Sequence, residues 1–360
     1  MLAAACTWTK ILLGLQVWNL TIGQIMRAAD CKKSAENLFS TERMKGAVFM
    51  SYQLSRINDA VRSDPRGFAQ ECDAAFHANV VTAAEKIAQH RERSPIILLS
   101  GPSGSGKTTT ALKIEERLDN TGMETHTVAM DNYFKTIDPE TAPRNREGDI
   151  DYESPFCLDV DLLNRHFAML DRGETIHIPK YEFARQMRSD ILSQPMTLGK
   201  DEMAIFEGIH ALNDIIVGKN PNAFKLYIAA GSDLVDDTGR VIFPRSWLRL
   251  CRRIVRDYKF RGSDAAFTLK LWANVRRGEK LYISPYKENA DLMFDSSLAF
   301  EYAVLKPYVV PLLEKIPRGM YPFVDEMLEN YKLIEEMDCS VVAENSLSRE
   351  FIGGSSYGSH

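Results

Sequence analysis

Three features that often indicate a function are scarce in this sequence: cysteine, excess charge of one sign, and long apolar runs. Only six of its 360 residues are cysteines, at positions 6, 31, 72, 157, 251 and 339, and none are spaced as a CxxC pair. The spacing argues against a cysteine-based zinc site and favours scattered thiols in a reduced, cytoplasmic chain.

The charge balance is nearly even, with 44 basic and 49 acidic residues and a formal net charge of −5. Without a basic field, we expect neither a nucleic-acid partner nor an anionic membrane surface. Residues 2–26 are rather apolar, but Lys10 and several polar residues interrupt them. They fit neither a secretory signal nor a spanning helix, so we expect an extension, or translation from Met44 or Met50.

Short apolar runs alternate with helical patterns along most of the chain. The runs that read as buried strands are residues 96–99, 125–130, 204–206, 225–229 and 291–294. Helical periodicity marks 68–93, 109–118 and the basic stretch 245–280. This alternation predicts an α/β fold with a doubly wound, mostly parallel sheet. Residues 175–180 and 190–198 interrupt the alternation and predict a small antiparallel excursion.

A glycine-rich loop follows the first of these strands at once. Residues 101–108 read Gly-Pro-Ser-Gly-Ser-Gly-Lys-Thr and match G-x-x-x-x-G-K-[ST], with a strand before and a helix after. In such a loop backbone N–H groups surround phosphate, the lysine reaches the β- and γ-phosphates, and the threonine hydroxyl binds Mg²⁺. The residues that we assign to binding ATP here are Gly101, Ser103, Gly104, Ser105, Gly106, Lys107, Thr108 and Thr109.

Two carboxylates follow predicted strands. Asp131 comes at the end of the second strand, at the edge where ligands bind in such sheets, and could position or deprotonate an acceptor hydroxyl. Glu207 follows the run 204–206 and could hold Mg²⁺ together with Thr108. The simpler alternatives are a turn or capping role for Asp131 and a helix cap for Glu207.

The basic stretch offers a second group of charges. Arg249, Arg252, Arg253 and Arg256 are spaced by three and four residues, so they share one helix face. Such a face could close over the nucleotide as a lid and offset charge on the transferred phosphoryl group. The alternative is an ordinary solvated helix face.

In this order, the motifs resemble the uridine kinase and phosphoribulokinase family of P-loop kinases, over residues 96–313. The resemblance rests on GPSGSGKTTT (101–110), DNYFK (131–135), IPKYEFARQMR (178–188), IFEGI (205–209) and RLCRRIVRDYKFRG (249–262). YISPYKENADLMFDS (282–296) and REFIGG (349–354) look like a bacterial nucleoside-kinase subgroup of it. We therefore expect three regions: an N-terminal extension (1–93, helical or poorly ordered), a P-loop kinase domain (94–317), and a C-terminal helix with a flexible tail (318–360). Residues 355–360 should be disordered.

The resemblance implies a role for each matching residue. Asp131 would accept the proton of a 5′-hydroxyl, while Tyr133, Tyr181 and Arg188 would contact the acceptor. The lid arginines of the family match Arg253, Arg256 and Arg261, which would contact phosphates and the acceptor.

Two departures concern the acceptor. Where the family's pyrimidine kinases hold the ribose with an aspartate, this chain has Glu153, and their base-reading histidine is replaced by Gln186. An amide presents two donors and an acceptor, so uridine specificity does not follow from the motif.

Together these features predict an ATP- and Mg²⁺-dependent phosphotransferase that acts on the 5′-hydroxyl of a nucleoside resembling uridine or cytidine. The alternatives are a kinase of another small alcohol, such as a sugar phosphate or pantothenate, and a non-catalytic ATP-binding regulator. A homo-oligomer is compatible with the sequence.

Overall fold

The computed structural model describes residues 39–44, 47–182, 185–191 and 195–358. The chain from Thr41 onward belongs to one compact unit. The extension predicted at residues 2–26 lies outside the described residues.

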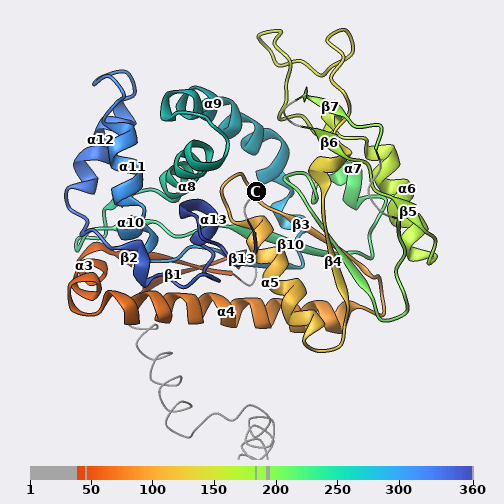
Figure 1. Cartoon of the computed structure of the whole chain (residues 1–360), viewed down its shortest axis with the longest axis horizontal. Coiled ribbons are helices and arrows are strands. Elements are labelled where there is room, and N and C mark those ends of the chain that lie inside the picture. Colours follow the sequence, from red (N-terminus) through yellow and green to blue (C-terminus); the bar gives the residue numbers. More distant parts are fainter. Residues whose placement is uncertain (1–38, 45–46, 183–184, 192–194, 359–360) are drawn as a thin grey trace, which may run out of the picture. The chain divides into compact units, whose positions relative to one another are not determined.

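A five-stranded parallel sheet forms the centre of the compact unit (Figure 1). In spatial order its strands are β13 (Leu292–Asp295), β10 (Phe224–Ala229), β3 (Ile96–Ser100), β9 (Met203–Glu207) and β4 (Thr125–Ala129). All four pairings are parallel. The strand that precedes the glycine-rich loop is therefore central, with β9 and β10 on either side. The predicted doubly wound sheet is confirmed.

The apolar runs explain why these five segments are strands. Every residue of β3 and of β9 is buried, as is usual for strands covered on both faces. Each run predicted from the sequence overlaps its strand and ends within one or two residues of it.

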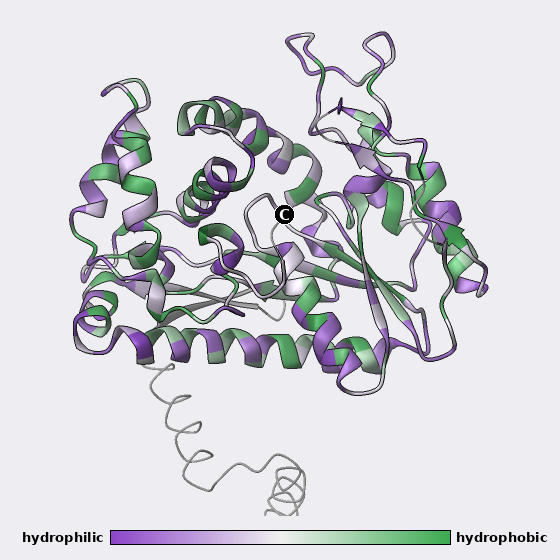
Figure 2. Ribbon diagram, in the orientation of Figure 1, coloured by the Kyte–Doolittle hydropathy of each residue, from purple (hydrophilic) through white to green (hydrophobic). Residues whose placement is uncertain are grey.

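Helices cover both faces of the sheet. Figure 1 shows α4 (Pro65–His90) on one side and α8 (Arg245–Phe260) with α9 (Ala265–Gly278) on the other. Figure 2 shows hydrophobic and hydrophilic residues alternating along α4, whose buried side chains include Phe76, in edge contact with Phe294 of β13. The remaining helices are α3 (Leu54–Ser63), α5 (Lys107–Asp119), α6 (Val160–Asp171), α7 (Asp214–Val217), α10 (Glu301–Val304), α11 (Lys306–Leu313), α12 (Pro322–Tyr331) and α13 (Arg349–Ile352).

Local signals fix the helix ends that matter for the site. The basic stretch is two helices, because Gly262 adopts φ +63° and Asp264 then caps α9 by accepting a hydrogen bond from the Phe267 amide at 2.8 Å. Asp64 caps α4 in the same way, accepting from the Gly67 amide at 2.9 Å.

Smaller sheets lie outside the centre. The predicted excursion is present as two antiparallel pairs, β5 (Ile176–His177) with β8 (Pro195–Met196) and β6 (Tyr181–Glu182) with β7 (Met187–Arg188). A four-stranded sheet that the sequence did not predict has the order β1 (Phe39–Met44), β2 (Ala47–Gln53), β11 (Leu234–Val235) and β12 (Val241–Phe243).

The sequence predicts disorder for 355–360, of which the structure describes 355–358. There the Tyr357 hydroxyl donates to Glu116 Oε2 at 2.5 Å and the ring lies 5.2 Å from Lys113 Nζ, so these residues contact α5. Among the helices of the described residues, none combines the length and apolarity needed to cross a bilayer.

Candidate active site

The glycine-rich loop connects β3 to α5 and needs glycine for two reasons. Gly104 and Gly106 both have φ +75°, a conformation that side chains resist. A Cβ at Gly104 would also lie 2.8 Å from the carbonyl oxygen of Arg249. The loop is therefore built to lie directly against α8.

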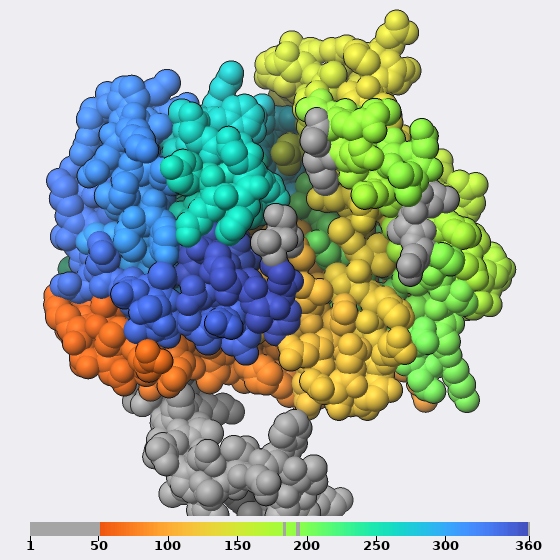
Figure 3. Space-filling model, viewed as in Figure 1, coloured from red at the N-terminus to blue at the C-terminus, as the bar shows by residue number. Residues whose placement is uncertain are grey.

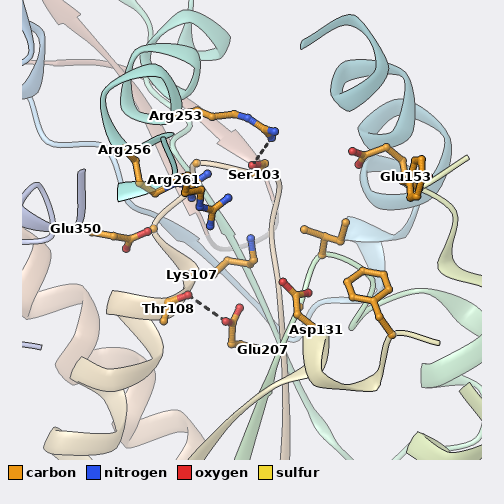
Figure 4. Close-up of a pocket in the computed structure, with 16 residues that line it drawn as sticks. Ser103, Lys107, Thr108, Asp131, Glu153, Glu207, Arg253, Arg256, Arg261 and Glu350 are labelled. Carbon is orange, nitrogen blue, oxygen red and sulfur yellow. Dashed lines mark hydrogen bonds between the residues drawn. The ribbon is translucent and has the colours of Figure 1, made fainter. Parts of the chain in front are cut away.

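A cavity of about 220 Å³ opens at this loop, where the carboxyl ends of β3, β4 and β9 meet (Figure 4). Its lining draws on the loop, the strand ends, α8 and the C-terminal residues. The lining residues are Ser103, Gly104, Gly106, Lys107, Thr108, Asp131, Phe134, Tyr152, Glu153, Glu207, Gly208, Ile209, Arg253, Arg256, Arg261 and Glu350.

Thr108 and Glu207 meet on the floor of the cavity. The Thr108 hydroxyl donates to Glu207 Oε1 at 3.0 Å, and Glu207 is 9% exposed (Figure 4). Burial raises the pKa of Glu207 to about 7; Lys107 opposes this shift and Asp131 adds to it. A hydroxyl and a carboxylate side by side are hard oxygen ligands of the kind Mg²⁺ prefers.

Lys107 and Asp131 face each other across the cavity (Figure 4). Burial lowers the pKa of Lys107, an effect that Glu207, Asp131 and Glu350 partly offset. Asp131 reaches solvent through the cavity, but loss of hydration on its other sides raises its pKa, against the attraction of Lys107, Arg261 and Arg256. The carboxylate is thus a stronger base than an aspartate in water.

Arginines of α8 form the opposite wall. Arg253 and Arg256 line the cavity with Arg261, which follows the helix, and Arg253 Nη1 donates to Ser103 Oγ at 3.0 Å. All three lie within ion-pair distance of Asp257, at 3.2, 3.0 and 3.6 Å respectively. Three guanidinium groups, two from α8 and one from the residue that follows it, therefore share the carboxylate of Asp257.

Arg249 and Arg252 do not join this wall, although the sequence placed them on the same lid face. Both side chains are buried and paired: Arg249 Nη2 lies 2.8 Å from Glu279 Oε2, and Arg252 Nε lies 3.0 Å from Glu301 Oε1. Each also donates to a loop carbonyl at 3.1 Å, Arg249 to Ser103 and Arg252 to Gly104. They hold the loop in place from behind.

Glu153 lines the cavity and is held there by the chain around it. A Cβ at Gly278 would lie 2.4 Å from the Glu153 Cβ, so α9 packs tightly against this residue. Two residues earlier, buried Asp151 accepts from Arg277 at 2.6 and 3.2 Å and from the Tyr282 hydroxyl at 2.9 Å. Burial raises the pKa of Glu153, against the opposing charge of Arg253.

Tyr133, predicted to contact the acceptor, does not reach the cavity. Its side chain is fully buried, and its hydroxyl lies 2.9 Å from His166 Nδ1. The next residue, Phe134, lines the cavity instead, because residues 130–133 form a 3₁₀ turn that directs Tyr133 into the core.

The other predicted acceptor contacts lie on the β6–β7 pair. Arg188 is engaged by protein, since Nη1 donates to Asp159 at 3.0 Å and Nη2 to the Tyr133 carbonyl at 3.1 Å. Gln186 is exposed with φ +50°, and the Tyr181 ring lies 5.6 Å from that of Phe134. None of the three lines the cavity as the described residues shape it.

Three residues assigned to the nucleotide lie just behind the surface of the cavity: Gly101, Ser105 and Thr109. Ser105 and Thr109 are buried, and a Cβ at Gly101 would lie 2.1 Å from the Ile228 carbonyl oxygen. The sequence predicted no role for Asp257 or Glu350, although they lie within the motifs 249–262 and 349–354. The hydrogen bond from Thr109 to Glu350 spans 241 residues, which no local pattern reveals.

A glycine-rich loop between a central parallel strand and a helix, with carboxylates at the neighbouring strand ends, defines a P-loop protein. The family model described as "Phosphoribulokinase / Uridine kinase family" matches residues 96–299, more than half of the chain. The chain belongs to this family, and membership supports an ATP-dependent kinase activity.

Curated relatives include uridine kinases from Staphylococcus aureus strains JH9 and Newman. Each is 30% identical over 199 residues, which are 55% of this chain and 86% of the relative. Solved structures with some similarity include a possible uridine kinase from Bacillus stearothermophilus (18% identity, TM-score 0.36, 56% of this chain and 88% of that one). Another is a D-glycerate 3-kinase from Cryptococcus neoformans (16% identity, TM-score 0.30, 71% and 86%).

Proposed function

We propose that this protein transfers the γ-phosphoryl group of ATP to the 5′-hydroxyl of a nucleoside, with uridine and cytidine as the first acceptors to test. The observation that carries the proposal is that a wall of arginines and a wall of carboxylates face each other in one cavity. Three arginines that share Asp257 face the carboxylates Asp131 and Glu207, with Lys107 between them.

The arginine wall suits the triphosphate. Three guanidinium groups and one shared carboxylate leave positive charge directed at the cavity, and a phosphoryl group in transfer carries negative charge on its oxygens. Lys107 and the loop amides hold the phosphates in the arrangement typical of such loops.

The floor of the cavity fits a magnesium ion. Thr108 and Glu207 would hold it, because they offer adjacent oxygens whose present hydrogen bond an ion could replace. When bound, Mg²⁺ offsets charge on the β- and γ-phosphates.

Asp131 is the proposed base. It would accept the proton of the acceptor hydroxyl while that oxygen bonds to the γ-phosphorus and the bond to the bridging oxygen of ADP breaks. Its raised pKa brings it closer to working pH, which favours proton transfer. Glu153, on the same side of the cavity, would accept hydrogen bonds from the hydroxyls of the acceptor sugar.

The test is a panel of acceptors incubated with the purified protein and Mg-ATP, with products separated by chromatography and identified by mass. We expect a 5′-monophosphate from at least one ribonucleoside. Sugar phosphates and pantothenate in the same panel test the alternative acceptors. Tight ATP binding with no product from any acceptor would indicate the regulator instead.

A matched pair of variants tests the base. Asp131→Asn should lower kcat by roughly 10²–10⁴-fold while ATP binding stays close to wild type. Asp161→Asn is the control, since this aspartate of α6 is 91% exposed and lies outside the cavity. If Asp131→Asn keeps near wild-type kcat, the base has been assigned to the wrong residue.

A further inference from the structure

The last described residues of the chain lie against the glycine-rich loop. We call residues 338–358 the C-terminal segment, and Figure 3 shows these dark blue residues packed beside α5 and beneath α9. The fully buried side chain of Leu347 lies so close to the loop that a Cβ at Gly106 would be 2.6 Å from its Cδ1. The segment thus forms one wall of the loop.

Hydrogen bonds to three separate helices hold the segment in place. Ser346 donates to Asp73 of α4 at 2.7 Å, and Lys259 of α8 donates to the Ile352 carbonyl at 2.5 Å. Tyr357 reaches α5, as described above. Within the segment, Arg349 donates to the Cys339 and Val342 carbonyls at 2.9 and 2.6 Å. A side chain that this segment directs into the cavity is therefore fixed in position.

Glu350 is that side chain. It is 8% exposed, lines the cavity, and accepts a hydrogen bond from Thr109 Oγ1 at its Oε2 atom, at 2.6 Å. Among the residues that the structure describes, none donates a hydrogen bond to Oε1. One oxygen anchors the carboxylate to the first turn of α5, and the other is available to a ligand.

The position of Glu350 along the cavity indicates which part of a nucleotide it would meet. Figure 4 shows Glu350 across Lys107 from Asp131 and Glu153. The γ-phosphate must lie near Asp131 for transfer, and the loop amides hold the α- and β-phosphates. The donor's sugar, attached to the α-phosphate, then leaves the loop on the side away from Asp131, where Glu350 lies.

The chemistry of a carboxylate narrows the contact further. An ionised carboxylate only accepts hydrogen bonds, and it repels phosphate oxygens. At this end of the cavity its natural partners are the hydroxyl groups of the donor's ribose.

We propose that Glu350 is a specificity-determining residue for the donor nucleotide, whose Oε1 accepts a hydrogen bond from a ribose 2′- or 3′-hydroxyl. The inference rests on the proposed function, because it takes the loop to hold a nucleoside triphosphate. It adds a preference for ribonucleotide over deoxyribonucleotide donors, carried by a residue outside the span of the family match.

The experiment compares ATP, 2′-deoxy-ATP and 3′-deoxy-ATP. Dissociation constants come from direct titration in Mg²⁺ buffer, and KM values from transfer to whichever acceptor the panel identifies. We expect the wild type to bind ATP roughly tenfold or more tightly than one of the deoxy analogues, the one that lacks the contacted hydroxyl.

The variants are Glu350→Gln, which keeps the shape and one acceptor oxygen, and Glu350→Ala, which removes both oxygens. We expect the preference to shrink in Glu350→Gln and to disappear in Glu350→Ala, through weaker binding of ATP with little change for the deoxy analogue. Glu344→Gln is the matched control, since this exposed glutamate belongs to the same segment but lies outside the cavity. It should leave all the ratios unchanged.

The outcomes separate the two proposals. A wild type that binds ATP with the expected preference but phosphorylates nothing contradicts the proposed function and leaves the inference standing. Equal binding of all three nucleotides by the wild type overturns the inference, as does an unchanged preference in Glu350→Ala. Tighter ATP binding in both Glu350 variants also overturns it, since Glu350 would then be an inhibitory charge. Glu350→Gln keeps the side-chain volume and an acceptor oxygen for Thr109, so the test does not depend on the folding of the alanine variant.

Discussion

Helix α8 carries two sets of arginines that differ in the carboxylates they meet. Arg252 is matched one to one by Glu301, and Arg249 pairs with Glu279, which also binds Arg276 of α9; both carboxylates come from other parts of the chain. Arg253, Arg256 and Arg261 share the single carboxylate Asp257. The same residue type on one helix therefore serves two purposes: matched charges fix the glycine-rich loop, and unmatched charges face the cavity where an anion would complete them.

The largest expected effect comes from breaking a matched pair. Arg252→Leu leaves Glu301, which is 0% exposed, without its counter-charge and should lower the free energy of unfolding by roughly 3–5 kcal/mol. Urea unfolding followed by circular dichroism measures the loss. The double variant Arg252→Leu/Glu301→Leu should recover part of it, because the stranded charge is gone. A loss below about 1 kcal/mol in the single variant would show that the pair is not structural.

Replacing one of the arginines that share Asp257 should have the opposite effects: a small change in stability and a large loss of activity. Arg256→Gln removes one of three cations around Asp257, so stability should change by less than about 1 kcal/mol. Under the proposed function, kcat at saturating ATP should fall roughly 10²–10³-fold, because a donor to the transferred phosphoryl group is lost. Arg256→Lys keeps the positive charge but lacks the planar guanidinium group, so its kcat should lie between those of the wild type and Arg256→Gln. The comparison fails if Arg256→Gln unfolds like Arg252→Leu or retains near wild-type kcat.

The difference between these sets also marks what sequence reasoning can achieve here. Spacing by three and four correctly predicted a helix but assigned its four arginines to one lid face, whereas only Arg253 and Arg256 line the cavity. It did not identify the matching carboxylates, since Glu279 and Glu301 lie 30 and 49 residues from their partners. Whether an arginine side chain is buried depends on those distant carboxylates. The spacing alone therefore could not distinguish the structural arginines, Arg249 and Arg252, from those that face the cavity.

The same reason accounts for the other outcomes. The central strands were predictable because buried parallel strands are continuous apolar runs. Strands β11 and β6 have two residues each, too short for any period to register. Tyr133 and Phe134 are adjacent aromatics, and only the 3₁₀ turn decides which of them faces the cavity. Glu350 lies in the quoted segment 349–354, but nothing local placed it at the cavity, because its partner Thr109 is 241 residues away.

His210 is a buried titratable group that forms no ion pair with any residue that the structure describes, although the charge of Asp151 acts on it. His210 is 1% exposed; burial lowers its pKa to about 4, and nearby backbone groups of Tyr282 and Glu153 only partly oppose this. The unfolded chain binds a proton near pH 6.5 that the folded chain resists. The stability present above pH 6.5 is therefore lost as the pH falls toward 4.

Between pH 7 and pH 5 this effect should cost on the order of 1–2 kcal/mol of unfolding free energy. Urea titrations at both values, on the wild type and on His210→Gln, isolate the contribution of this residue. The variant should lose clearly less stability over the interval than the wild type does. Parallel losses in the two proteins would mean that the ring is not held neutral by burial.

The smallest effect is expected at the first residue of α8, where Arg245 tests whether matching alone confers stability. Arg245 forms a two-point contact with Asp233, at 2.9 and 3.2 Å, so its charge is matched as well as that of Arg252. Its side chain, however, is 45% exposed, where water screens the attraction and removal strands no buried charge. Arg245→Gln should therefore cost at most about 1 kcal/mol, and less at 1 M salt than at 0.1 M. A loss as large as that of Arg252→Leu would show that pairing, and not burial of the partner, makes these arginines structural.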